Sequence, residues 1–197
     1  LIDEIKWGMD WLLKMNQSNG SSLSIVALSH ASPPSAAVGQ SLYGPATTNA
    51  TMRSAAAFAL GAKIFKEVNA SAFSTYSDTL KARAEKAYTW GLQNPSKIFN
   101  NNSQSNGSQG IGAGNQETDS LGRFTAKMGA ALYLYELTSS SNYLSEFENG
   151  VPKLPLIAWG NYASQYFQVQ QHLLLRYVKL TNAKTNLVTQ IKNATTA

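Results

Sequence analysis

Apolar residues recur every three or four positions along most of this chain, which is the period of an amphipathic helix. The clearest example is the stretch 112–138, where Thr118 or Asp119 can supply the side-chain oxygen that caps a helix start. The positions that follow form one apolar stripe at helical spacing: Leu121, Phe124, Met128, Ala131, Leu132 and Tyr135. The pattern predicts a helix that begins just after its cap and buries this stripe.

The same period predicts further helices over most of the remaining sequence. They cover 1–15, 47–67, 75–92, 142–148, 162–180 and 183–192. Turn-forming residues at 69–74 and the Asn94-Pro95 pair separate consecutive helices. Strand-like patterning is weak, with 23–28 as the one candidate for a short extended piece, and residues 193–197 are expected to fray. The predicted fold class is all-α, with helices in antiparallel pairs.

Two long polar segments interrupt the helical pattern. Residues 16–45 carry several glycines and prolines, and residues 96–117 are rich in Gly, Ser and Asn. A connection this long in a compact domain is usually functional, so we expect the functional surface to lie on these segments.

Composition and charge narrow the function classes. The chain has 197 residues, 43% of them hydrophobic, which is enough for a packed core. It has no cysteine, which excludes disulfides, thiolate metal sites and cysteine catalysis. The net charge is +5, but the basic residues are scattered, so we predict no nucleic-acid partner. No apolar run reaches the roughly 18 residues that a membrane span needs, so we predict no membrane partner.

Glu117 and Asp119 are the acidic residues that stand together outside a regular helix. They are candidates for catalysis or ligand binding, and the alternative is that they only cap the following helix. Arg123 lies four residues after Asp119 and is expected to pair with its carboxylate. No dinucleotide fingerprint, P-loop, HExxH or Ser-His-Asp spacing is present, and we predict no cofactor and no metal.

Three segments together resemble glycoside hydrolase family 9, whose cellulases are built on an (α/α)6 toroid. The first is LIDEIKWGMDWLLKM at 1–15, and the second is YGPATTNATMRSAAAFALGAKIFKE at 43–67. The third combines AYTWGLQNP at 87–95 with GNQETDSLGRFTAKMGAALYLYELTSSSNYL at 114–144. The order and spacing of these segments carry the resemblance, which covers most of the chain. It implies that the helix pairs form part of such a toroid.

The sequence also departs from the family pattern. The family's catalytic aspartates belong to an Asp-Ala-Gly-Asp type motif upstream of the first helix, and its general acid is a glutamate near the far C-terminus; neither motif is found in this sequence. The resemblance therefore implies a single partial catalytic domain over 1–197. The family inverts configuration, which needs two carboxyl groups about 6.5–9.5 Å apart. Glu117 and Asp119 are two residues apart and meet this only if the backbone turns between them.

Aromatic side chains are candidates to pack against sugar rings, because these rings have apolar faces. We select Tyr43, Trp7 and Trp159 as substrate-binding candidates, together with His30 and Arg123 for sugar hydroxyls. Core packing is the alternative for each aromatic residue on a helix. His172 is interpreted as structural. Four further acids are interpreted as solvated helix positions: Glu85, Glu136, Glu146 and Glu148.

The resemblance implies a fragment of a β-1,4-glucanase from a bacterium, secreted or periplasmic, that contributes part of a cleft for a β-glucan. A partial toroid exposes helix faces, so we also predict a homodimer or an exchange of helices. Two alternatives stay open. One is a non-catalytic helical binding or scaffold module, which a fixed repeat would support. The other is a different toroid enzyme such as a polysaccharide lyase, with His30 and Tyr43 as its candidate residues.

Overall fold

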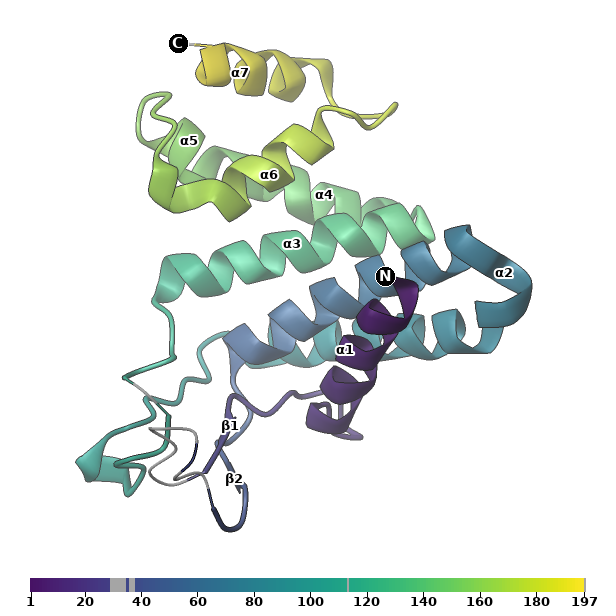
Figure 1. The fold of residues 1–197 in the computed structure, drawn as a ribbon. Helices are drawn as coiled ribbons and strands as arrows, with labels where there is room; N and C mark the ends of the chain where they lie inside the picture. The colour runs from purple at the N-terminus through teal and green to yellow at the C-terminus, as the bar shows by residue number, and fades with distance from the viewer. Residues whose placement is uncertain (29–34, 36–37, 113, 197) are drawn as a thin grey trace.

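The computed structural model describes residues 1–28, 35, 38–112 and 114–196, and it is dominated by helices (Figure 1). The longest elements are α1 (Ile2–Met15), α2 (Thr48–Gln93), α3 (Ser120–Thr138), α4 (Ser141–Gly150), α6 (Gln168–Tyr177) and α7 (Thr185–Thr196). Shorter ones are β1 (Val26–Ala27), β2 (Leu42–Tyr43), η2 (Gln104–Asn106), η3 (Val151–Lys153), α5 (Pro155–Ala158) and η4 (Gln165–Phe167). The predicted all-α class is confirmed.

Helix α2 is two antiparallel helices joined at Asn69. The backbone of Asn69 leaves the helical region, with φ −159° and ψ 91°. Its side-chain Oδ1 accepts a hydrogen bond from the Ala72 amide at 3.0 Å, which caps the second helix. The chain therefore reverses direction here, as the predicted turn requires, and the two halves of α2 lie side by side (Figure 1).

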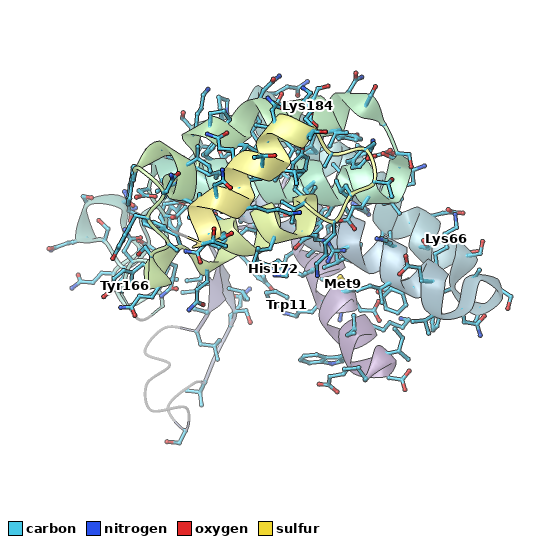
Figure 2. All side chains as sticks on the ribbon, turned by 90° about the horizontal axis from the view of Figure 1, so that it is seen from above. Met9, Trp11, Lys66, Tyr166, His172 and Lys184 are labelled. Atoms are coloured by element: carbon cyan, nitrogen blue, oxygen red, sulfur yellow. The ribbon has the colours of Figure 1, made fainter. Side chains whose placement is uncertain are left out.

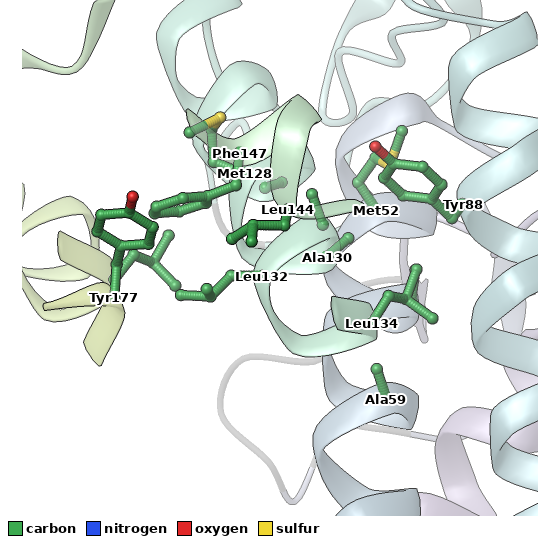
Figure 3. Close-up of a cluster of buried hydrophobic side chains, with 14 of the residues drawn as sticks. Met52, Ala59, Tyr88, Met128, Ala130, Leu132, Leu134, Leu144, Phe147 and Tyr177 are labelled. Atoms are coloured by element: carbon green, nitrogen blue, oxygen red, sulfur yellow. The ribbon is translucent and has the colours of Figure 1, made fainter. Parts of the chain in front are cut away.

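The core lies where α3 packs against both halves of α2 on one side and against α4 and α6 on the other. Figure 3 shows large side chains such as Met128, Leu132 and Phe147 meeting in this layer. Each fully buried side chain of this size contributes roughly 1.5–3 kcal/mol. The contact between α2 and α3 is lined by small residues such as Ala59 and Ala130, which let the two helices approach closely.

The C-terminal third differs from the sequence prediction in two places. The helix expected over 162–180 is shorter, because Gly160 and Asn161 have positive φ values of 77° and 66° and the chain becomes helical only at 165–168. The fraying expected from residue 193 is wrong, since α7 continues to Thr196 and buries Ala194 against the core.

The segment after α1 is held by side-chain hydrogen bonds and short extended pairings. The Asn16 amide donates to the Gly20 carbonyl at 2.8 Å and to the Ser22 hydroxyl at 3.1 Å. Strand β1 pairs antiparallel with β2, which sets Val26 opposite Tyr43. The extended piece expected at 23–28 is therefore present, but only two of its residues belong to a strand.

The first half of α2, α3 and α6 all begin at the same end of the molecule, on the left of Figure 1. The described parts of 94–119 and the strands β1 and β2 lie in the lower part of this end, and segment 159–167 lies in its upper part; we name this the loop end. A buried hydrogen bond from the Gln170 amide to the Thr125 hydroxyl, 2.9 Å long, joins α6 to α3 near their starts. Among the described helices, none is both long and apolar enough to cross a membrane.

Candidate functional site

The polar segment before α3 is organised around one buried side chain, Asn101. Its amide nitrogen donates to the carbonyls of Ile111 and Gly114 at 2.9 and 2.8 Å, and its Oδ1 accepts from the Gln116 amide at 2.7 Å. These bonds close the loop and bring the residue after Gln116, Glu117, against the start of α2.

Both carboxylate oxygens of Glu117 accept hydrogen bonds from backbone amides. One accepts from Phe99 at 2.9 Å and the other from Thr118 at 3.0 Å. The carboxylate lines a small polar cavity that also includes Thr47, the N-cap of α2, and Ser24. The positive end of the α2 dipole favours a negative group at this position. Glu117 is thus a fixed acceptor at the loop end.

The cavity beside Glu117 has room for one water-sized group, with a volume of about 20 Å³. The Ser24 hydroxyl is buried and has no hydrogen-bond partner within the described chain. Asn49 and Asn101 complete the polar lining. An unpaired buried hydroxyl needs a partner, so this cavity is suited to a water or a ligand hydroxyl.

Asp119 has a different role from Glu117. It is the N-cap of α3, and its Oδ1 accepts from the Gly122 amide at 2.8 Å. Arg123 donates to the Thr118 carbonyl at 2.8 Å, and the structure, over the residues it describes, contains no ion pair between Arg123 and Asp119. The predicted cap is confirmed and the predicted ion pair is wrong, since the Arg123 guanidinium bonds the Thr118 carbonyl instead.

Tyr43 lies close to the Glu117 cavity. Its side chain is 58% exposed on β2, and the next residue, Gly44, contacts Ser24 and the Phe99 ring so closely that only glycine fits. A Cβ at Gly44 would lie 2.4 Å from the Ser24 oxygen and 2.9 Å from the Phe99 ring. Glycine therefore allows the segment with Tyr43 to pack on the segment with Glu117.

The other predicted binding residues lie apart from this cavity. Trp159 is 56% exposed on the segment before α6, and its ring meets that of Phe167 edge-on at 5.0 Å. Tyr166, on the same segment, lies at the loop end, opposite Lys66 (Figure 2). Trp7 is 71% exposed on α1, and His30 lies outside the described residues.

Two acids that the sequence suggested were solvated are buried instead. The side chain of Glu136 is 6% exposed and pairs with Lys63 at 2.7 Å and with Arg176. Glu148 accepts from the Tyr177 hydroxyl at 2.7 Å and pairs with Lys184 at 2.8 Å. Burial, together with the bond to Glu148, raises the pKa of the Tyr177 hydroxyl above its ordinary value. Their partners are 29 to 73 residues away in sequence, which local patterns do not reveal.

His172 also differs from its prediction. It was expected to be structural, but it is exposed on α6, whereas the next two residues, Leu173 and Leu174, face the core. Among the residues that the structure describes, no three His, Asp or Glu side chains are grouped so as to hold a metal ion.

The helices form antiparallel pairs, and the first half of α2, α3 and α6 all begin at the loop end. This arrangement is typical of the (α/α) toroid class. The sequence model of Glycosyl hydrolase family 9 matches residues 1–197, and the chain belongs to this family. A cellodextrinase from Butyrivibrio fibrisolvens is 32% identical over 150 residues, which are 74% of this chain and 25% of that protein.

Solved structures show the same fold. A metagenome-derived glycoside hydrolase family 9 endoglucanase superposes with a TM-score of 0.72 at 22% identity, covering 98% of this chain and 33% of its own. A Bacteroides ovatus family 9 protein gives a TM-score of 0.77 at 20% identity, covering 98% of this chain and 35% of its own. The predicted family and the predicted part of an (α/α)6 toroid are confirmed. The chain spans about a third of the length of these structures and a quarter of that of the cellodextrinase.

Proposed function

We propose that this chain is part of a glycoside hydrolase that cleaves β-1,4-glucans, and that its loop end forms part of the glucan cleft. Family membership supports the reaction class, and the names of the similar proteins, a cellodextrinase and endoglucanases, support the substrate class. The loop end carries the long connecting segments, the polar cavity beside Glu117, and the exposed rings of Tyr43 and Trp159.

One observation carries the placement of the cleft. Glu117, fixed by two backbone amides, and the unpaired Ser24 hydroxyl line a cavity that has room for a single hydroxyl. The exposed Tyr43 directly precedes Gly44, which packs against Ser24 and Phe99, two residues that line this cavity. A fixed acceptor, an unpaired hydroxyl and an aromatic ring are the groups that orient a sugar. Trp159, on the segment before α6, is a second exposed aromatic ring, apart from this cavity.

Glu117 and Asp119 stay our candidates for catalytic acids. Backbone amides engage both oxygens of Glu117 and one oxygen of Asp119, so the difference between them is their position: Glu117 lines a polar cavity, whereas Asp119 caps α3. We propose that Glu117 contacts the substrate and that Asp119 acts mainly through the helix start.

The test is a reducing-sugar assay on a soluble cellulose derivative with the chain, Glu117→Gln and Asp119→Asn. The matched control is Glu4→Gln, which neutralises an exposed carboxylate on α1. The proposal is supported if the rate of reducing-sugar release falls in Glu117→Gln and stays unchanged in Glu4→Gln. Activity that is unaffected by Glu117→Gln contradicts the role of this residue.

We further propose that the protein acts outside the cell and that the isolated chain associates with itself. A polymeric glucan is reached more readily outside the cell. The exposed rings of Trp7 and Trp11 on α1 and the exposed Leu175 on α6 provide apolar surface for association. Sedimentation at high concentration tests this, and a clean monomer would contradict it.

A further inference from the structure

A second hollow lies on the opposite side of the α2 start from the Glu117 cavity. It has a volume of about 310 Å³ and is enclosed by the beginning of α2, the end of α2 and the first turns of α3. The neighbouring residues Thr47 and Thr48 line different cavities, and no described residue lines both cavities. The hollow is therefore separate from the sugar-binding position proposed above.

The floor of this hollow is apolar. Met52, which is fully buried, and Phe124 lie beside Leu92 and Pro95. Leu92 is 46% exposed and contributes to the lining of the hollow. Such a floor suits a flat hydrocarbon body rather than a chain of hydroxyls.

Gly91 makes room for the floor. A Cβ at this position would lie 2.5 Å from the terminal carbon of Met52, so a side chain here would push Met52 into the hollow. Glycine weakens a helix interior, and this close approach is the physical reason for its presence near the end of α2.

The rim of the hollow is positively charged. Arg123 and Lys127 lie four residues apart on one face of α3, and none of the described residues that line the hollow is acidic. Lys127 is paired with Glu146 outside it. Arg123 uses one terminal nitrogen for the Thr118 carbonyl, and its other guanidinium nitrogens have no partner within the part of the chain that the structure describes. A partly unsatisfied guanidinium above an apolar floor is complementary to a carboxylate.

We propose that this hollow binds a small carboxylic acid with a flat apolar body, held by Arg123 and by the floor of Met52, Leu92 and Phe124. The volume of about 310 Å³ is at the lower end of the roughly 300–1,000 Å³ that is usual for ligand sites, so a single-ring acid fits it readily. A neutral glucan would leave the guanidinium without a charge partner, so this ligand differs in class from the proposed substrate.

The test is calorimetric titration of the chain with trans-cinnamate, with cinnamyl alcohol and with glucuronate. The alcohol has the same ring without the charge, and glucuronate has the charge without the apolar body. Saturable binding of cinnamate, at least about tenfold tighter than either comparison compound, is expected. Equal binding of the alcohol or of glucuronate, or no binding of cinnamate, would overturn the proposal.

Variants locate the site. Arg123→Gln is expected to weaken cinnamate binding about tenfold, and Arg53→Gln, at an exposed arginine of α2, to leave it within about twofold. Leu92→Gln changes the floor at a partly exposed position without touching the α3 start, and it is expected to weaken binding as well. Circular dichroism checks that each variant is folded. Cinnamate binding that survives both Arg123→Gln and Leu92→Gln would overturn the assignment to this hollow.

Discussion

Arg176 on α6 and Glu136 on α3 form a two-pronged ion pair, in which Nε and Nη2 of the arginine donate to the two carboxylate oxygens. The Nη2 bond is 2.7 Å long, and Lys63 on α2 donates to the same carboxylate at 2.7 Å. One buried acid thus joins three helices that begin at the loop end. The relative positions of these helices, and so of the site, depend partly on this carboxylate.

Removing both cations should destabilise the chain by more than the sum of the single changes. Lys63→Met and Arg176→Met each leave Glu136 with one partner, so each is expected to cost about 1 kcal/mol. The double variant leaves a buried carboxylate unpaired and is expected to cost about 3–5 kcal/mol. Urea unfolding of the four proteins measures this, and simple additivity would contradict the network.

Stability should fall in acid partly through Glu136. Burial raises the pKa of its carboxyl, but the hydrogen bonds and charges of Arg176 and Lys63 outweigh this and hold the pKa below its ordinary value. Because the pKa is lower in the folded state, the ionised carboxylate contributes its full stabilisation above the unfolded-state pKa of about 4.3. This contribution is lost as the pH falls through the lower folded-state pKa. The unfolding free energy of Glu136→Gln should therefore show a weaker acid decline than that of the parent. Glu4→Gln is the control, and an unchanged decline in Glu136→Gln would contradict the assignment.

Gly44→Ala should separate the two segments beside the Glu117 cavity. The added Cβ would meet Ser24, Ile25 and Phe99 within 3 Å, and overpacking of this kind typically costs about 1–3 kcal/mol. Gly8→Ala is the matched control, since a Cβ at Gly8 on α1 meets no atom within 4 Å. The control should stabilise the chain by roughly 0.5–1 kcal/mol. Thermal unfolding measures both, and equal effects of the two would contradict the close packing at Gly44.

The helix-capping role of Asp119 can be tested separately from a catalytic role. Asp119→Ala should cost about 1 kcal/mol, because the Gly122 amide loses its acceptor. Asp119→Asn should retain most of the stability, since asparagine is an equally good cap. An Asp119→Asn protein that is fully stable but inactive on glucan would show that this acid has a role beyond capping.

The sequence correctly predicts the structural features that depend on residues nearby in the chain. The Asp119 cap, the turn at Asn69 and the burial of Met128, Ala131 and Leu132 follow from local propensity and helical spacing. These features need no knowledge of distant contacts.

Features that depend on distant partners were not predicted. Glu136 and Glu148 have the spacing of solvated positions, and only the packing of α6 and the segment after it on α3 and α4 buries them. The Glu117 cavity is formed by three segments that are distant in sequence. Glu117 could be selected as a candidate from the sequence, but its hydrogen bond from the Phe99 amide could not be predicted. The late start of α6 follows from positive φ values at Gly160 and Asn161, which the apolar pattern does not encode.

The most direct test of the central claim is an amide NMR titration of the chain with cellotetraose, with the α-1,4-linked maltotetraose as the comparison sugar. Shift changes are expected at the loop end, around Tyr43, Glu117 and Trp159, and not around Lys66 at the opposite end. Glu117→Gln should weaken the response, and maltotetraose should give little. Changes centred away from the loop end, or equal responses to the two sugars, would contradict the assignment of this end to β-1,4-glucan binding.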